Sequence, residues 1–282
     1  MTFRLRTIAL PVFCTLLQIT AFAGVADGMA AYKQHDYSAA LREFKEAAST
    51  GDAAAQYQLA NMIRSGQGVA SNIDEAVKWY RLAADHGNAD AQLELGFLYL
   101  IGKLQNYQEA AKLFRMAADQ GVAMGQFSYG GMYERGYGVA QDTNEAIKWF
   151  RMAAAQGYDV AQFKLARMFQ KGEGVTQDYK EALKWCRLAA DQRHAGALLI
   201  LGEMYQSGNG VPESRNVAYA LYSLSAMVNT DRSTWAAEQN RTKLAQTMSS
   251  PEIRAAQDLI RGVTQSGQLL KTLDKYAKSL KS

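Results

Sequence analysis

Cysteine and histidine are scarce in this chain of 282 residues, and their scarcity limits the chemistry open to it. It has two cysteines and three histidines. Cys14 lies in an N-terminal segment that we expect to be removed, so Cys186 stands alone and an intramolecular disulfide is excluded. His35, His86 and His194 have no second histidine or cysteine at ligand spacing. We therefore expect no metal site and no cofactor.

Proline is also rare, with three residues, and the abundance of Ala, Leu, Lys, Glu and Gln favours helix. The formal net charge of +4 is too small to indicate a nucleic-acid partner. No Gly-x-Ser-x-Gly elbow or other nucleophile signature is present. The recurring Gly-x-Gly-Val sequences lack the lysine and the preceding strand of a phosphate-binding loop. We expect a protein that is not an enzyme.

Residues 1–23 have the pattern of a secretory signal. Arg4 and Arg6 give a charged start, residues 8–22 are mostly apolar, and Ala21-Phe22-Ala23 places small residues where a signal peptidase reads them. The alternative is an uncleaved membrane anchor, which the shortness of the apolar run disfavours. The sequence thus predicts an exported protein, periplasmic or secreted, without a stable membrane span after cleavage.

A block of about 36 residues recurs along the rest of the chain. Its end is marked by Gly51, Gly87, Gly121 and Gly157, which are 36, 34 and 36 residues apart. Each block reads as a first helix (helix A), a glycine turn and a second helix (helix B). The turn glycines and the helix B tryptophans, which we expect to be structural, are Gly66, Gly68, Trp79, Gly136, Gly138, Trp149, Gly172, Gly174 and Trp185.

In each of the two helices, helical spacing places the apolar residues on one face. Helix A shows Ala91, Leu95, Gly96 and Tyr99, and helix B shows alanines around an aromatic pair. The tryptophans are therefore expected in the core, with Trp149 as a buried anchor. A single hairpin of this length cannot bury its own apolar face, so copies stack into an all-α solenoid.

These residues carry a family resemblance. The motifs A-x-x-x-L-G-x-x-Y, G-x-G-V and E-A-x-K-W-[YF]-x-x-A-A with a closing glycine resemble Sel-one-like repeats, relatives of tetratricopeptide repeats. The resemblance implies an α/α superhelix that acts as a protein-interaction scaffold, often in bacterial secreted or periplasmic regulatory proteins. One subgroup with paired cysteines is linked to β-lactam binding. This chain lacks those cysteines, so that activity is not expected here.

The pattern defines three segments and several departures. We expect a signal peptide at 1–23, the solenoid at 24–228 and C-terminal capping helices at 229–282. The repeat at Gly102-Lys103 is two residues short and has Leu113 in the tryptophan position, and Arg193 replaces a closing glycine. In the tail, Ser250 is the expected helix cap, and a leucine-striped basic final helix has contact with anionic lipid as its alternative role.

Helix A positions that are not used for packing should line a concave groove. Residues three or four positions apart lie on the same face of a helix. In each helix A we therefore expect two residues, three positions apart, to face the groove. The predicted binding residues are Asn61, Arg64, Phe97, Leu100, Gly131, Glu134, Arg167, Gln170, Glu203 and Gln206. Gly131 is a second glycine inside a helix, which predicts a notch for a partner side chain between Phe97 and Arg167; neutral drift is the alternative.

The mixture of aromatics with charges of both signs predicts a groove for a protein or peptide in the cell envelope. The expected function is therefore a secreted or periplasmic scaffold or regulator. One alternative is a cell-envelope accessory protein that binds peptidoglycan or glycan, or an enzyme of the cell wall. Another is a secreted effector directed at a host. Neither the partner nor the oligomeric state follows from the sequence.

Overall fold

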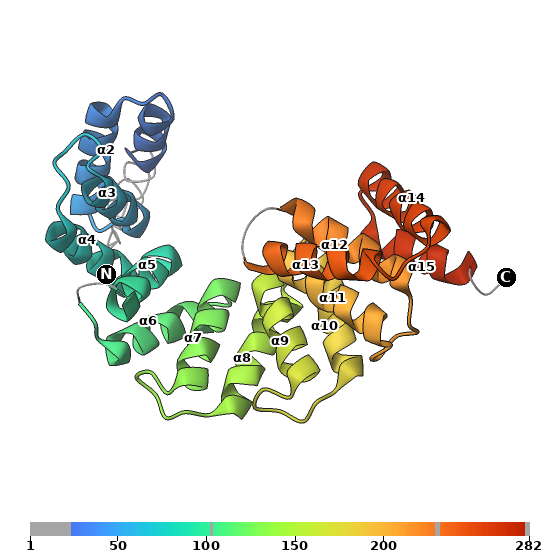
Figure 1. The fold of residues 1–282 in the computed structure, drawn as a ribbon. Helices are drawn as coiled ribbons and strands as arrows, with labels where there is room; N and C mark the ends of the chain where they lie inside the picture. Colours follow the sequence, from blue (N-terminus) through green and yellow to red (C-terminus); the bar gives the residue numbers. More distant parts are fainter. Residues whose placement is uncertain (1–23, 102–103, 229–231, 280–282) are drawn as a thin grey trace, which may run out of the picture. The chain divides into compact units, whose positions relative to one another are not determined.

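The computed structural model of the chain describes residues 24–101, 104–228 and 232–279. The predicted signal segment, 1–23, lies outside these ranges, as do Gly102 and Lys103 of the shortened repeat. Within them the chain is helical and contains no strand (Figure 1). The expected all-α class and the consecutive helical hairpins are confirmed.

The helices group into two compact units. The first ends at Gly125. It begins with a helix at residues 24–33, which pairs with α2. Its labelled helices are α2 (Tyr37–Ser49), α3 (Ala53–Ser65), α4 (Ile73–Asp85), α5 (Ala89–Ile101) and α6 (Tyr107–Asp119). The expected N-terminal hairpin is therefore present.

The second unit begins at Gln126, inside α7. Its helices are α7 (Ala123–Arg135, from Gln126), α8 (Thr143–Ala155), α9 (Asp159–Lys171), α10 (Tyr179–Asp191), α11 (Ala195–Ser207), α12 (Arg215–Val228), α13 (Arg232–Ala245), α14 (Ser250–Ser266) and α15 (Leu269–Ser279). It holds the hairpins α7–α8 (from Gln126), α9–α10 and α11–α12, and the C-terminal tail.

Short polar side chains begin several of the helices, and glycines end α3, α9, α11 and α14. Asn72 Oδ1, for example, accepts a hydrogen bond from the backbone N–H of Glu75 at 3.1 Å, and so satisfies a free donor at the start of α4. Gly66 ends α3 with φ +74°, a left-handed conformation in which a side chain would be strained. The paired turn glycines have positive φ in every hairpin where both are present. Their predicted turn role is confirmed.

In the hairpins α5–α6 and α11–α12 the core holds an aromatic ring from helix B seated against a glycine of helix A. Phe114 is fully buried, and a Cβ added to Gly96 would lie 2.7 Å from its Cε1 atom. Tyr222 stands in the same relation to Gly202, at 2.6 Å. Because those distances are too short for a methyl group, glycine is what allows the two helices to approach.

In three hairpins a buried glutamine of helix A, at Gln56, Gln92 or Gln162, bonds to the end of the preceding helix B. Gln92 Nε2 in α5 donates to the carbonyl of Ala84 near the end of α4 at 3.1 Å, while its Oε1 accepts from Gln120 at 2.8 Å. Gln162 repeats the first bond with Ala154 at 3.0 Å. These bonds satisfy carbonyls that a helix leaves free at its C-terminal end. The pairs Ala-Gln or Gly-Gln recur in the sequence, but their role was not predicted.

Arg193 keeps the left-handed backbone of the glycine it replaces, with φ 64°. That conformation costs a non-glycine residue about 1 kcal/mol. The structure supplies a reason for the substitution, since Arg193 Nη2 donates to the carbonyl of Val263 in α14 at 3.3 Å. A glycine could not make this link to the tail.

The tail packs on the last hairpins. α13 contacts α11 and α12, α14 contacts α12, and α15 contacts α14 and α10. The helix α14 is capped by Ser249, whose backbone and side chain both interact with Glu252; the expected cap, Ser250, is already the first helical residue. The serine was misplaced by one because Ser249 and Ser250 are adjacent and both precede Pro251. No helix in the described ranges is long and apolar enough to cross a membrane.

Candidate functional site

The predicted binding residues of the first unit lie on α3 and α5, where two of them also support the core. Asn61 Oδ1 accepts a 2.5 Å hydrogen bond from the hydroxyl of Tyr80, and burial raises the pKa of that hydroxyl. Phe97 meets the ring of Phe114 edge-on at 5.0 Å. These two side chains are therefore half-buried structural contacts as well as parts of the helix A face.

Arg64 and Leu100 are more open. Arg64 is exposed, pairs with Glu94 of α5 at 3.1 Å, and lies with its guanidinium carbon 5.8 Å from the centre of the Tyr80 ring. Leu100 is half-buried. In this unit the helix A face combines one cation, one acid and a partly exposed apolar side chain.

In the second unit the predicted residues form a connected polar surface on neighbouring helices. Glu134 of α7 pairs with Lys164 of α9. Gln170 Nε2 of α9 donates to Glu203 Oε2 of α11 at 3.2 Å. Gln206 Oε1 accepts from the hydroxyl of Tyr222 at 2.6 Å. The structure therefore brings predicted residues of α9 and α11 into direct contact.

Two polar atoms of this surface lack a hydrogen-bond partner within the described part of the chain. They are Arg167 Nε and Gln170 Oε1, both shielded from solvent. Arg167 Nε lies 3.3 Å from Glu173 Oε2, but the alignment is too poor for a hydrogen bond. A buried donor and acceptor left unpaired are each costly, so a ligand that paired with them would gain free energy.

Glu203 has the most perturbed carboxylate on this surface. Burial raises its pKa, while the hydrogen bond from Gln170 and the charge of Lys171 lower it in part. The net direction is upward, so ionised Glu203 is held at a cost in free energy. A cationic group of a ligand would offset that cost.

Gly131 does not form the predicted open notch. It is buried, and a Cβ built on it would lie 3.2 Å from Nη1 of Arg135, whose guanidinium also reaches the Gly131 carbonyl at 3.4 Å. The space over the glycine is filled by a side chain one turn further along the same helix. A sequence pattern that assigns faces does not show how a long side chain folds back over its own helix.

The predicted core role of the tryptophans holds for one of the three. Trp185 is buried, whereas Trp79 and Trp149 are half-buried. Trp149 lies edge-on to Tyr129 at 5.1 Å. The buried anchor of each helix B is the next residue, such as Phe150 at 1% exposure. Both positions face inward on a helical wheel, and only packing decides which one is covered.

The remaining reactive residue types have structural roles. Cys186 is fully buried, and burial raises the pKa of its thiol, as expected for a small apolar residue. His194 accepts a hydrogen bond from the backbone N–H of Ala197 and stacks on Phe163 at 4.4 Å. The described residues contain no group of three or more His, Cys, Asp or Glu side chains that could hold a metal ion.

Sequence reasoning missed the partners of the predicted residues. Glu94, Lys164, Lys171 and Glu173 each form an ion pair with a predicted binding residue or with one another. Glu94 and Lys164 occupy equivalent positions in their helices, next to the predicted face. A charged residue at the same position of both helices was the signal in the sequence that could have identified these partners.

These features define an α-solenoid of helical hairpins whose exposed helix faces carry polar contacts. The Sel1 repeat family matches residues 53–88, 89–122, 123–158, 159–194 and 195–229, which is more than half of the chain. The chain belongs to the Sel1 repeat family. The resemblance found in the sequence is therefore confirmed, and the hairpin at residues 24–49 lies outside the matched repeats.

Two solved structures show the similarity in three dimensions. The crystal structure of a Sel1 repeat protein from Oxalobacter formigenes has 29% sequence identity and a TM-score of 0.69, with 73% of this chain and 86% of that chain covered. That of c5321, a protective antigen of uropathogenic Escherichia coli with an SLR fold, has 24% identity and a TM-score of 0.54, with 92% and 63% covered. The second likeness supports the fold alone. No curated protein matches the chain.

Proposed function

We propose that this protein is an exported scaffold that binds a partner protein or peptide through the helix A faces of its repeats. Sel1 repeats commonly form protein-interaction scaffolds, and the unit from Gln126 onward offers a defined surface for that role on α9 and α11. Export is proposed from the apolar segment at residues 1–23. Periplasmic and secreted locations are both compatible with that segment.

The observation that carries the proposal is the pair of unsatisfied atoms, Arg167 Nε and Gln170 Oε1. They lie one turn apart on α9 and present one donor and one acceptor. An extended peptide backbone offers the same pair of groups, a carbonyl and an N–H. Beside them, Glu203 favours a cationic side chain in the peptide. We therefore expect a peptide with a lysine or arginine beside its anchored backbone.

The test is site-specific photocrosslinking in cells that make the protein naturally. A photoreactive amino acid at Gln170 should capture a discrete partner. The same amino acid at Lys180, which is exposed on α10, is the matched control. A partner captured equally from both positions would place the binding surface elsewhere. Retention of the mature chain on purified cell wall, with no protein captured from Gln170, would favour the peptidoglycan alternative.

A further inference from the structure

Gln170 of α9 and Glu203 of α11 form a polar contact in the second unit that uses only half of the glutamine amide. Gln170 Nε2 donates to Glu203 Oε2 at 3.2 Å. The other polar atom of the amide, Oε1, is shielded from solvent and accepts no hydrogen bond within the described part of the chain. A buried acceptor without a donor is costly, so the contact is incomplete as it stands.

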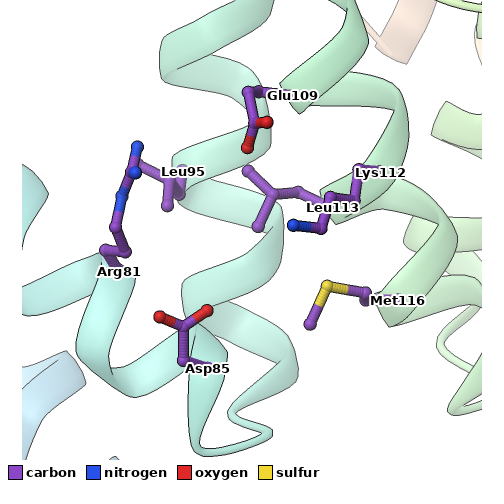
Figure 2. A pocket seen from close by; sticks show the side chains of 7 residues that line it. All are labelled: Arg81, Asp85, Leu95, Glu109, Lys112, Leu113 and Met116. Atoms are coloured by element: carbon purple, nitrogen blue, oxygen red, sulfur yellow. The ribbon is translucent and has the colours of Figure 1, made fainter.

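The charged side chains around a cleft in the first unit are in a different situation. Figure 2 shows Asp85, Glu109 and Lys112 around this cleft of about 170 Å³, which α4, α5 and α6 form. Asp85 and Lys112 are exposed, and Glu109 is half-buried. Solvent therefore supplies hydrogen bonds to these groups whatever their charge. Gln170 Oε1 is closed to solvent, so its missing donor has to come from a neighbouring side chain.

Glu203 is the neighbour that can supply this donor, and it can do so only when it binds a proton. An ionised carboxylate accepts hydrogen bonds and donates none, which is why the amide presents its nitrogen to Glu203. A protonated carboxyl group has one oxygen that accepts and one O–H that donates. The amide of Gln170 offers the complementary pair, an N–H and a carbonyl. A turn of the carboxyl group about its terminal bond would place the O–H opposite Gln170 Oε1 and close a ring of two hydrogen bonds.

The surroundings of Glu203 favour the uptake of a proton. Burial raises the pKa of its carboxyl group, while the hydrogen bond from Gln170 and the charge of Lys171 lower it only in part. The net direction is upward, so Glu203 takes up its proton at a higher pH than an exposed glutamate does.

The side chains of α10 and α12 that sense the charge of Glu203 stay neutral while it titrates. Burial and that charge both raise the pKa of the Cys186 thiol in α10 and of the Tyr222 hydroxyl in α12. On α10 and α13, which also contact α11, charged side chains already have partners: Arg187 pairs with Asp274, and Arg241 with Glu238. Glu203 is therefore the group of this contact that changes its charge in acid.

Proton uptake also changes the charge of the surface around the contact. Arg167 Nε and Lys171 Nζ lie 3.3 and 3.8 Å from the carboxylate oxygens of Glu173. With Glu203 ionised, these two cations stand beside two carboxylates. With Glu203 protonated, one cation is in excess, and the surface no longer attracts a cationic ligand.

We propose that Glu203 and Gln170 form a proton-operated switch: when Glu203 binds a proton, its O–H pairs with Gln170 Oε1 and the contact closes. The effect on binding rests on the proposed function. A bound peptide loses the carboxylate that attracts its cationic side chain, and its backbone N–H loses the acceptor. The partner is therefore held at neutral pH and released in acid. Because one proton is taken up, its affinity falls by at most about tenfold for each pH unit below the midpoint of the switch.

Nuclear magnetic resonance of the chain from residue 24 onward tests the switch without any partner. Carbon-13 labels report the side-chain carbonyl of Gln170 and the carboxyl of Glu203, and each signal is identified by its loss when that residue is changed to leucine. A carbonyl carbon signal moves downfield when its oxygen accepts a hydrogen bond. We expect the Gln170 signal to move downfield as the pH falls, with the same midpoint as the carboxyl signal of Glu203.

Two substitutions of Glu203 separate hydrogen bonding from charge. Glu203→Gln and Glu203→Leu both remove the charge, but only glutamine carries an N–H that can pair with Gln170 Oε1. The Gln170 signal should stay downfield at every pH in Glu203→Gln and upfield at every pH in Glu203→Leu. Circular dichroism establishes that both variants are folded. Equal signals in the two variants, or a parent signal that does not move with pH, would overturn the switch.

The protein captured from Gln170 in the crosslinking test is the probe for the effect on binding. Its affinity for the parent chain should fall as the pH passes below the midpoint. Glu203→Gln should bind it weakly at every pH, and Glu203→Leu should bind it better than Glu203→Gln because Gln170 Oε1 stays free. An affinity that does not change through the midpoint would overturn the release in acid. If no protein is captured at all, the proposed function fails and the release with it, while the resonance experiment still decides the switch.

Discussion

The junction of α4, α5 and α6 and the junction of α10, α11 and α12 are built from the same repeat positions and differ in what covers them. Both have leucine in the tryptophan position, at Leu113 and Leu221. Leu221 is fully buried in α12, which the tail helices α13 and α14 contact, and Leu113 is also buried, at 5% exposure, without any tail helix beside it. The comparison shows that the repeat buries leucine in the tryptophan position with or without added helices, and that the tail helices add contacts only at the last junction.

Removal of α15 should produce the largest effect, because it would remove the contacts of this helix with α10 and α14. A chain that ends at Ser266 loses the burial of Leu269 and Leu273. We expect the free energy of unfolding to fall by about 4 kcal/mol, as for two buried leucines truncated together. Urea denaturation measures it, and full-length Leu273→Ala should lose about half as much. Unchanged stability together with lost liposome binding would instead support the membrane role of this helix.

Opening a filled tryptophan position should have the next largest effect. Trp185→Leu removes a buried ring and its hydrogen bond to Glu181 and should cost about 2–3 kcal/mol. Trp149→Leu, at a half-buried position, should cost about 1 kcal/mol. Thermal melts compare the two variants. If Trp149→Leu proves the more damaging, the half-buried tryptophan is an anchor after all.

The paired arginines test the role of the charged positions. Arg187→Ala breaks the interaction with Asp274 and should lower the free energy of unfolding by about 0.5–1 kcal/mol, because the pair is partly exposed. Arg81→Ala, at the junction of α4, α5 and α6, removes contacts with the Tyr99 ring and hydroxyl and should change it by less than about 0.5 kcal/mol. Denaturation of both variants in one buffer gives the difference. Equal losses would mean that α15 does not depend on the arginine.

The smallest expected effect is a difference between the two regions in how stability depends on pH. Glu203 in α11 has a raised pKa, whereas its counterpart in α5, Phe97, does not titrate. Because folding raises the pKa of Glu203, the protonated side chain makes its full contribution to stability below the ordinary pKa of glutamate. That contribution is lost as the pH rises through the raised value. Glu203→Gln should therefore be more stable than the parent at pH 7, and melts at decreasing pH should show the gap closing. A gap independent of pH would assign the effect to packing.

The repeat pattern predicted the hairpins because it reports directly on helical spacing. The positions of Leu59, Ala60 and Ile63, for instance, were assigned to a buried helix A face, and all three are buried. The glycine turns followed from the strain that any side chain meets at positive φ. Pattern analysis was weaker for side chains that reach beyond their own turn. Arg135 over Gly131, and Arg193 toward Val263, were not foreseen because long side chains choose among many rotamers.

The sequence by itself determined the all-α class, the hairpin boundaries, the turns and the membership of a repeat family, since these depend on spacing within about one period of the chain. Only the tertiary structure decided which helix B ring is buried and where the tail rests. Those outcomes depend on contacts between segments far apart in sequence, such as Arg187 with Asp274. A one-dimensional pattern records each residue's face, whereas burial is decided by what another helix places on that face.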